Sequence, residues 1–497
     1  MIDIKSLSFK YSDSKEYTLK NISLHINSGE IVVISGKSGS GKTTLLRHLK
    51  KELMPKGEKS GDLEINCSSL EIGYLFQDPH TQIVEDYVYH EIAFGLENLG
   101  IPYLEMRHRV GEIVQYFHLE EIYDKRTSEL SGGQKQLVNL ASIMVMQPKI
   151  LLLDEPLAQL DPKSREQFIS MLECIHHDFG ITIIMVSHIL DEIYDCIDRL
   201  LLLDKGTLIY NDHPSKINHI DEESKMLLPV HIQLLMKTQQ PLDTPFYRIS
   251  DVIESLNYNV RDYKESEPII EVKHLYAGYS DDVLTDLSFN INKQEFYCIL
   301  GSNGSGKTTL LRCLMNDMKY QGKMSVKGKV AYLPQEPLLL INKDSIQEEL
   351  KGYDSRKVEA FLDKFELSHL FESHPYTHPY DLSGGQQQLL SLTKLLLNDF
   401  DLLLLDEPTK GIDPIMKDIL GVLLEELINN GKTIICVSHD LEFCGTYGSY
   451  FTMLFHHRMD EFTRKEEFFA HNYFYTTQLA KITRDKNLVI SLKDVIW

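Results

Sequence analysis

The sequence predicts an α/β fold that is built twice along the chain. Short apolar runs of strand length alternate with stretches of helical periodicity. A glycine-rich loop follows one such run near residue 36, and a second follows another near residue 301. The motifs after the first loop then recur in the same order after the second, which is the mark of a duplicated unit. Unbroken apolar runs such as 402–405 favour parallel strands buried on both faces.

The order of elements supports this division. Residues 2–34 read as antiparallel strands that lead into the first loop, and a hairpin is expected near 200–210. Between them we expect alternating helices and strands, at 44–53, 72–76, 81–123, 135–146, 149–153, 164–179 and 181–186. Motif density drops from about 212 to 262, and the order restarts at Ile269. We therefore expect a first domain over 1–235, a linker over 236–267 and a second domain over 268–497.

The two glycine-rich loops share one pattern, in which four residues separate two glycines and Lys-Thr follows. This is the P-loop signature, whose backbone N–H groups and following helix surround phosphate oxygens. Its lysine reaches the β- and γ-phosphates, and its threonine hydroxyl ligates magnesium. The repeat argues against a glycine-rich turn without a ligand. The residues expected to hold nucleotide are Gly36, Lys37, Ser38, Gly39, Ser40, Gly41, Lys42, Thr43 and Thr44, and Gly301, Ser302, Asn303, Gly304, Ser305, Gly306, Lys307, Thr308 and Thr309.

Two acidic residues end an apolar strand in each half. Asp154 and Asp406 are candidates to hold magnesium, and Glu155 and Glu407 are placed to polarise a water against the γ-phosphate. Alone, such a pair is usually a solvated strand end. Downstream of a P-loop in both copies, it indicates a nucleotide site.

Composition limits the classes of partner. The 51 basic and 73 acidic residues give a net charge of −22, which disfavours nucleic acid, because phosphate backbones are bound through basic surfaces. The seven scattered cysteines fit reduced thiols in the cytosol better than disulfides or a metal site. The start lacks a signal-peptide pattern, and no apolar run approaches the length of a membrane span. We therefore expect any membrane role to come through a partner.

The pentapeptide Leu-Ser-Gly-Gly-Gln at 130–134 and 382–386 completes a resemblance to the ATP-binding-cassette (ABC) ATPase family. The resemblance covers Met1 to Tyr210 and Ile269 to about Met459. It implies two P-loop NTPase nucleotide-binding domains, each a RecA-like core with an antiparallel β subdomain and a helical subdomain. It also implies ATP and Mg²⁺ as cofactors and two ATP molecules held head to tail between paired cassettes.

The family's site residues carry over position by position. Each P-loop would face the signature of the other cassette, formed by Ser131, Gly132, Gly133 and Gln134 or by Ser383, Gly384, Gly385 and Gln386. The catalytic set implied is Glu155, Glu407, His188, His439, Gln77 and Gln335. The magnesium set implied is Thr43, Gln77, Asp154, Thr308, Gln335 and Asp406. With all core motifs intact in both copies, we expect two hydrolytic sites.

Two further motifs match less closely. Tyr11 and Tyr279 stand where the family stacks an aromatic ring on adenine, although the chain's 25 tyrosines make chance a fair rival. Asp161 and Asp413 stand at the D-loop spacing. The first copy reads Ala-Gln-Leu-Asp where members commonly have Ser-Ala-Leu-Asp. That departure puts communication between the sites in doubt, not ATP binding.

One segment narrows the subgroup. Residues 77–84 and 91–100 resemble the Q-loop and following helix of energy-coupling-factor importers, which take up vitamins and transition-metal ions. The second copy has a shorter, different segment at 335–340. The chain thus resembles the two ATPase subunits of that subgroup fused in tandem. The resemblance implies an integral membrane scaffold subunit, a small substrate-binding membrane subunit, and a location on the cytoplasmic face of the cell membrane.

Two alternatives stay open. One is a soluble tandem cassette protein that acts on ribosomes or DNA, which would be expected to show a long charged linker and a basic surface. The other is a sugar-importer ATPase, against which the intact duplicate sites and the string Ala-Phe-Gly-Leu-Glu-Asn argue. The residues do not name the cargo, because the membrane partners choose it.

Overall fold

The computed structural model describes residues 1–12, 14, 16–217, 220–242, 244, 257–258, 263, 266–278, 282–484 and 488–496. Internal contacts divide the chain into unit 1, Met1–Pro229, and unit 2, Val230–Trp497. Each unit is described by itself. No helix in the described ranges is both long and apolar enough to cross a membrane.

Unit 1 contains an antiparallel sheet and a mostly parallel one. The three-stranded antiparallel sheet has the order β2-β1-β4, with bounds Leu19–Ile26, Ile2–Tyr11 and Gly57–Ile65. The six-stranded sheet has the order β5-β6-β7-β3-β8-β9, with bounds Ile72–Leu75, Ile150–Asp154, Thr182–Val186, Ile31–Gly36, Arg199–Asp204 and Thr207–Asp212. Its first five strands are parallel and β9 is antiparallel. The carboxyl ends of β3, β6 and β7 therefore share one edge.

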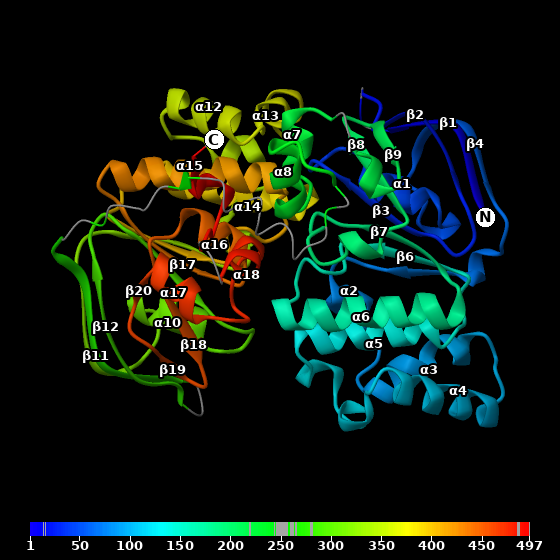
Figure 1. Ribbon diagram of the computed structural model, residues 1–497, viewed down its shortest axis with the longest axis horizontal. Coiled ribbons are helices and arrows are strands. Elements are labelled where there is room, and N and C mark those ends of the chain that lie inside the picture. Colours follow the sequence, from blue (N-terminus) through cyan, green and yellow to red (C-terminus); the bar gives the residue numbers. More distant parts are fainter. Residues whose placement is uncertain are drawn as a thin grey trace. The chain divides into compact units, whose positions relative to one another are not determined.

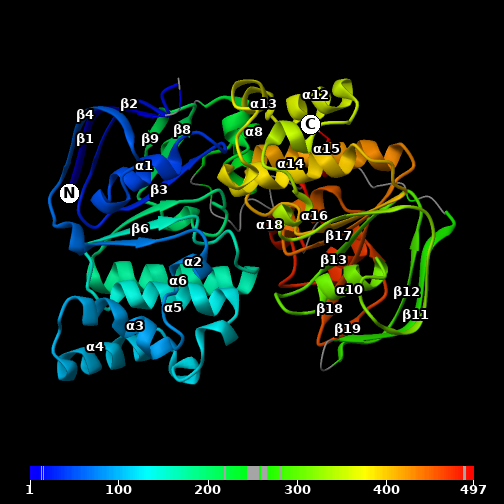
Figure 2. The ribbon, with the colours of Figure 1, turned by 180° about the vertical axis from the view of Figure 1, so that it is seen from behind.

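The helices of unit 1 cover the six-stranded sheet. They are α1 Lys42–His48, α2 Pro79–Gln82, α3 Val88–Asn98, α4 Tyr103–Tyr116, α5 Gly132–Met144, α6 Pro162–Phe179 and α7 Glu222–Lys225. Residues Leu45 and Leu46 of α1 pack in one core between the two sheets. Helix α5 contacts α6, and α3 and α4 contact α5, so these form the helical subdomain (Figures 1 and 2).

The bounds of α6 follow from its sequence. Asp161 accepts a hydrogen bond from the Ser164 N–H, Pro162 occupies the first turn, and Gly180 ends the helix at φ 60°. A carboxylate cap satisfies a free N–H group, proline lacks the N–H that would be unpaired there, and glycine tolerates the left-handed conformation.

Unit 2 repeats the arrangement. Its antiparallel sheet has the order β12-β11-β14, with bounds Asp282–Asn292, Pro268–Gly278 and Gln321–Val326. Its larger sheet begins β15-β16-β17-β13-β18, with bounds Val330–Leu333, Leu402–Asp406, Thr433–Ser438, Phe296–Leu300 and Tyr450–Phe455. The short strands β19 Arg458–Met459 and β20 Thr463–Arg464 pair with β18, and β10 Asn257–Tyr258 pairs with β21 Val495–Ile496.

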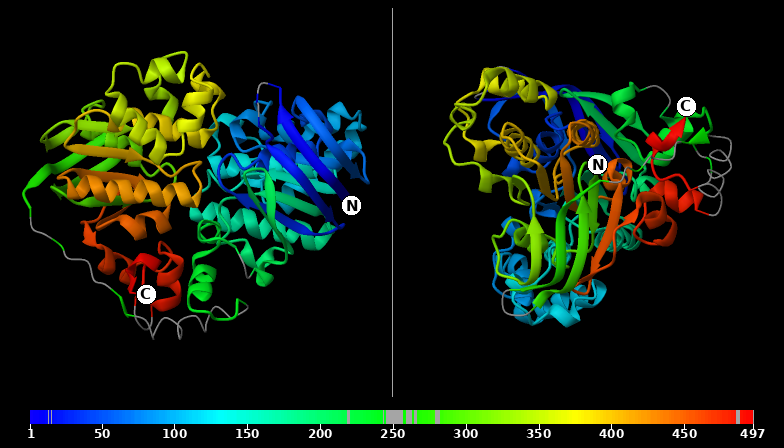
Figure 3. Two further views of the ribbon diagram at one scale, coloured as in Figure 1. Left: turned by 90° about the horizontal axis from the view of Figure 1, so that it is seen from above. Right: turned by 90° about the vertical axis from the view of Figure 1, so that its left-hand side faces the viewer.

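Within the described residues, the helices of unit 2 are α8 Val230–Lys237, α10 Lys307–Leu314, α11 Ile346–Glu349, α12 Ser355–Lys364, α13 Ser368–Ser373, α14 Gly384–Leu396, α15 Pro414–Asn429, α16 Leu441–Tyr447, α17 Lys465–His471 and α18 Gln478–Thr483. Helix α15 lies along the sheet and contacts β17 (Figure 3, left, orange). Helix α8 contacts α18, so the segment around residue 235, the expected end of the first domain, lies in unit 2.

The core explains the unbroken apolar strand 402–405. Leu402 and Leu404 pack with the antiparallel sheet, whereas Leu403 and Leu405 pack with the helices. Because strand side chains alternate between faces, a strand covered on both sides has no position for a polar residue. The expected fold, a RecA-like core with an antiparallel β subdomain and a helical subdomain in each unit, is confirmed.

Candidate nucleotide sites

The first P-loop joins β3 to α1 through positions that only glycine fits. A Cβ on Gly36 would lie 2.2 Å from the Leu203 carbonyl oxygen, and Gly41 has φ 98°. Lys42 is buried, and its Nζ donates to the carbonyl oxygens of Gly36 and Lys37 at 2.9 and 2.7 Å. The loop is therefore closed around its own lysine.

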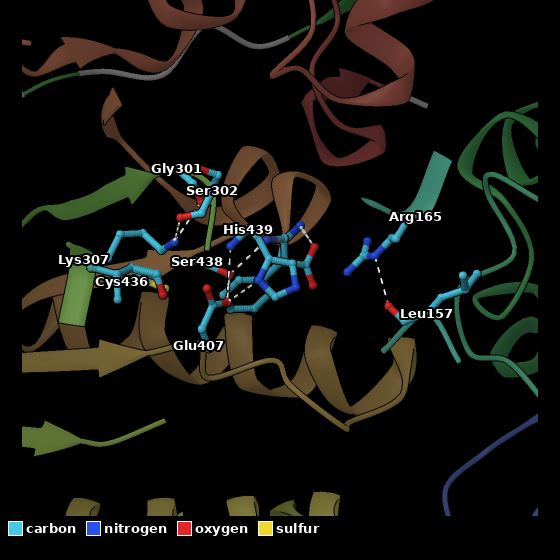
Figure 4. A network of polar contacts seen from close by, with 12 residues as sticks. Leu157, Arg165, Gly301, Ser302, Lys307, Glu407, Cys436, Ser438 and His439 are labelled. Atoms are coloured by element: carbon cyan, nitrogen blue, oxygen red, sulfur yellow. Dashed lines mark hydrogen bonds and ion pairs between the residues drawn. The ribbon is translucent and has the colours of Figure 1, made fainter. Parts of the chain in front are cut away.

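The second P-loop has the same geometry. Lys307 Nζ donates to the carbonyl oxygens of Gly301 and Ser302 at 2.8 and 3.0 Å (Figure 4), and Gly306 has φ 105°. Ser40 Oγ and Ser305 Oγ stand at the same position of the two loops, and each is buried without a hydrogen-bond partner among the described residues. A buried hydroxyl without a partner is costly, and an anion would supply the acceptor. The donor set thus fits a phosphate group.

Asp154 lies beside the first loop. Thr43 Oγ1 donates to its Oδ1 and the Tyr74 hydroxyl donates to its Oδ2, both at 2.9 Å. Burial raises the pKa of Asp154, and the two hydrogen bonds oppose that shift. The Thr43 and Asp154 oxygens are of the kind that Mg²⁺ prefers, so they fit that ion.

Asp406 repeats this position in unit 2. Burial raises its pKa to about 6, against the hydrogen bonds from Thr308 and Tyr332. The Tyr332 hydroxyl donates to Asp406 Oδ2 at 3.3 Å. The two copies therefore place the same three groups, an aspartate, a threonine and a tyrosine, around the end of the apolar strand.

Each catalytic glutamate candidate sits in a left-handed conformation, with φ 47° at Glu155 and 49° at Glu407. A non-glycine residue held there costs free energy and is found at functional sites more often than elsewhere. Glu155 accepts from Gln77 Nε2 at 2.8 Å, and its Oε1 lies 2.8 Å from His188 Nε2. The first unit thus brings Gln77, Glu155 and His188 together as expected.

Glu407 has different neighbours. Its Oε2 accepts from Ser438 Oγ at 3.1 Å and from the His439 N–H at 3.2 Å (Figure 4). The ring Nδ1 of His439 lies 2.9 Å from the same oxygen. Gln335 is exposed and makes no hydrogen bond with any described residue, so unit 2 leaves it apart from Glu407.

The charges around Glu407 decide its protonation. Burial favours the neutral form, but the positive charges of His439 and Lys307 outweigh it and hold the pKa of Glu407 below its ordinary value. The carboxylate is therefore ionised at neutral pH and able to accept a proton.

Comparison with known proteins supports the duplicated site. The model of the ABC transporter family matches residues 19–158 and 284–410. A candidate ABC transporter ATP-binding protein of Bacillus thuringiensis subsp. konkukian is 37% identical over 97% of this chain and 95% of its own length. The chain belongs to the ABC transporter ATP-binding family. It is an ATPase with two cassettes, one in each unit.

A second relative and a solved structure are also similar to this chain. A candidate HMP/thiamine import ATP-binding protein of Bacillus subtilis is 30% identical over 90% of this chain and 88% of its own length. The archaeal ribosome recycling factor aABCE1, solved with the stalk protein aP1, aligns with a TM-score of 0.64 over 93% of this chain and 90% of its own at 20% identity. At that identity the structure supports the tandem cassette fold alone.

The signature of each cassette begins a helix. Ser131 Oγ accepts from the Gln134 N–H while Gln134 Oε1 accepts from the Ser131 N–H, and Ser383 and Gln386 repeat this reciprocal cap. A Cβ on Gly132 or Gly384 would meet nothing within 4 Å. These glycines are therefore not required by the packing of their own unit. Their pairing with the opposite P-loop stays a prediction.

The structure shows where three of the four tyrosine and D-loop positions lie. The Tyr11 hydroxyl and Thr44 Oγ1 are hydrogen-bonded at 2.9 Å, which places the ring beside α1. Tyr279 lies outside the described residues. Asp161 and Asp413 cap α6 and α15, so both have a structural role in the cassette. Arg165 Nε, one turn into α6, donates to the Leu157 carbonyl oxygen at 3.2 Å (Figure 4).

Sequence reasoning missed Tyr74 and Tyr332, whose hydroxyls donate to the aspartates. The signal was present, because each tyrosine precedes its Q-loop glutamine by three residues in both cassettes. A repeated tyrosine in a buried strand is a candidate for a buried hydroxyl contact.

Proposed function

We propose that this ATPase is the duplicated ATP-binding subunit of an energy-coupling-factor type importer that takes up a vitamin or metal ion. It would act at the cytoplasmic face of the membrane, with an integral scaffold subunit and a small substrate-binding subunit. The relative from Bacillus subtilis, whose name assigns HMP/thiamine import, supports an importer of a micronutrient.

The observation that carries the proposal is a set of exposed apolar side chains in the segment and helices that follow Gln77 in the chain. In unit 1 the side chains of Val84, Leu99, Tyr103 and Leu104 are 66%, 44%, 68% and 78% exposed. They belong to the segment and helices that follow Gln77, whose amide binds Glu155. A contiguous patch of exposed apolar side chains marks a surface for a protein partner, and we propose that these four side chains form one. A partner seated there would act on the catalytic glutamate through Gln77.

Within each site we assign roles to the residues already placed. Lys42 and Lys307 would hold the β- and γ-phosphates of ATP. Magnesium would be held by Thr43, Asp154 and Gln77 in unit 1 and by Thr308, Asp406 and Gln335 in unit 2, and it supplies charge neutralisation at the phosphates. Glu155 and Glu407 would take the proton of the attacking water, and His188 and His439 would hold the γ-phosphate.

Affinity purification from detergent-solubilised membranes tests the proposal. We expect tagged wild-type chain to recover integral membrane proteins, and Val84→Asp/Leu104→Asp to lose them while keeping its ATP turnover. Leu70→Asp is the matched control, because Leu70 is 70% exposed but lies outside that surface. Recovery of ribosomes alone would contradict the proposal and favour a soluble tandem cassette protein. Recovery of a sugar transporter would show that the chain is a sugar-importer ATPase and not an energy-coupling-factor ATPase.

A further inference from the structure

A buried glutamate holds the segment after the Q-loop glutamine in both cassettes. We name residues 79–85 and 337–343 the post-glutamine segments. Glu91 Oε2 accepts the backbone N–H groups of Val84 and Glu85 at 2.9 and 2.8 Å. Glu349 Oε2 accepts those of Asn342 and Lys343 at 3.0 and 2.8 Å. Both glutamates are almost fully buried, at 3% and 4% exposure.

The signature helix holds the start of each segment too. In unit 1, Asn139 Nδ2 on α5 donates to the Pro79 carbonyl oxygen at 3.0 Å. In unit 2, Ser391 Oγ on α14 donates to the Pro337 carbonyl oxygen at 2.8 Å. Up to this point the two cassettes have equivalent contacts.

The cassettes differ at the next turn of the signature helix. Lys394 of α14 forms a salt bridge with Glu349 Oε1 and donates to the Leu340 carbonyl oxygen at 2.7 Å. Unit 1 has Ser142 at that place, and its hydroxyl donates to Asn139 of its own helix. The carboxylate of Glu91 thus binds its segment without a cation from the signature helix. In unit 2 the salt bridge adds a further charge-assisted contact to the two hydrogen bonds that the backbone N–H groups donate to the carboxylate.

We propose that Glu349 and Lys394 are positioning residues for ATP hydrolysis, which join the segment after Gln335 to the helix that carries Ser383, Gly384 and Gln386. Because Glu349 is buried and both residues are hydrogen-bonded to the segment, we expect that segment and α14 to move as one body. The signature of unit 2 then follows any displacement of Gln335. In unit 1 the signature helix holds its segment through Asn139 and through Lys135, whose Nζ lies 3.1 Å from His80 Nδ1, but no cation among the described residues of α5 binds Glu91. The inference depends on the ATPase activity alone and is independent of the importer proposal.

Substitutions at the pair test this in the full chain. Lys394→Met keeps the length of the side chain and loses its charge, and Glu349→Gln keeps an acceptor for the two N–H groups. We expect both to lower kcat for ATP about fivefold to tenfold with KM for ATP within about twofold of wild type. Lys394→Arg, which restores the cation, is expected to recover kcat.

The repeat supplies the matched control. Glu91→Gln makes the same change in unit 1, where no cation is lost, and we expect kcat to stay within about twofold of wild type. Wild-type kcat in Lys394→Met and Glu349→Gln would overturn the proposal, as would equal losses in Glu91→Gln and Glu349→Gln. Failure of Lys394→Arg to recover activity, or a rise in KM that accounts for the loss, would also overturn it. Because the two variants lie on opposite partners, one that fails to fold leaves the other as the test.

Discussion

At the scale of single residues, the two catalytic glutamates have the same backbone conformation but different neighbours. Glu155 is bound by Gln77 and His188, whereas Glu407 is bound by Ser438 and His439. Gln77 follows the end of a strand and precedes the exposed apolar side chains of unit 1 in the chain. The equivalent Gln335 is exposed and makes no hydrogen bond with any described residue. The sequence motifs are equivalent, but the contacts in the two sites are not.

The first residue-scale prediction concerns these glutamates. Glu155→Gln and Glu407→Gln each remove a proton acceptor while keeping the side-chain shape. We expect the double variant to lower ATP turnover about 10²-fold or more with ATP binding retained, and each single variant to lose at least its own site's share. Steady-state hydrolysis and equilibrium nucleotide binding measure the two effects. Full activity in a single variant would show that its site is not hydrolytic.

The second residue-scale prediction concerns Glu91, whose pKa is raised by burial against two backbone hydrogen bonds. Between its unfolded and folded pKa values the folded chain binds more protons than the unfolded chain, so the free energy of unfolding falls as pH rises through that window. Glu91→Gln carries no charge and keeps an acceptor. We expect it to be more stable than wild type at pH 8, with the difference disappearing near pH 4.

Chemical denaturation across this pH range measures that difference. Asp178→Asn is a suitable control, because the pKa of Asp178 is lowered by hydrogen bonds from His177 and Tyr116, which gives a pH dependence of opposite sign. A constant stability difference between Glu91→Gln and wild type from pH 4 to 8 would contradict the argument.

At the scale of elements, the two glycines of each signature are needed for different structural reasons. Gly132 and Gly384 have open space where a Cβ would stand, whereas a Cβ on Gly385 would lie 2.5 Å from the Gly411 carbonyl oxygen. In unit 2 the second glycine is required by the approach of the D-loop to the signature helix, whereas in unit 1 a Cβ on Gly133 would lie 2.9 Å from Ser164 Oγ on α6. The first is unexplained within its unit, which is consistent with close approach of a ligand or partner.

This separation predicts opposite outcomes for the two positions. Gly384→Ala and Gly132→Ala should keep the wild-type melting temperature and lose ATP turnover. Gly385→Ala should cost about 1–3 kcal/mol of unfolding free energy, because the backbone of the D-loop has to move. Thermal unfolding and hydrolysis rates on the same preparations separate the effects. A stable and fully active Gly384→Ala chain would remove the first signature glycine from the site.

Elements were predictable where apolar periodicity and glycine signals agree. The P-loops, the apolar strands before the acidic pairs and the helices after the signatures lie as expected, because each is encoded within about ten neighbouring residues. The salt bridge between the buried Glu349 and the part-exposed Lys394 was not predictable. A charged residue in a helical pattern usually faces water, and only packing of a distant helix makes it a buried contact. Gln335 was also not predictable. Its motif is intact, but it makes no hydrogen bond with Glu407 of the kind that Gln77 makes with Glu155.

At the scale of the whole molecule, the boundary between the cassettes is set by packing and not by motif density. The sequence places the end of the first domain at 235, inside α8. Leu234 and Leu235 of that helix are fully buried, and His231 Nδ1 lies 3.2 Å from Gln478 Oε1 of α18. An amphipathic helix in a stretch without motifs gives no signal of which cassette it covers. We propose that the second domain begins at Val230, whereas the sequence predicts a first domain that ends at 235, a linker and a second domain that begins at 268.

The last prediction tests that boundary in the full chain. Leu234→Ala removes a fully buried side chain and should cost about 2–5 kcal/mol, borne by unit 2 alone. Hydrogen exchange should then show lower protection in α18 and in strands of the unit 2 sheet, with protection in unit 1 unchanged. Leu172→Ala in α6 is the matched control, because Leu172 is 3% exposed in unit 1 and should give the reverse pattern. If Leu234→Ala instead lowers protection in the unit 1 sheet, α8 belongs to the first cassette and the boundary near 235 stands.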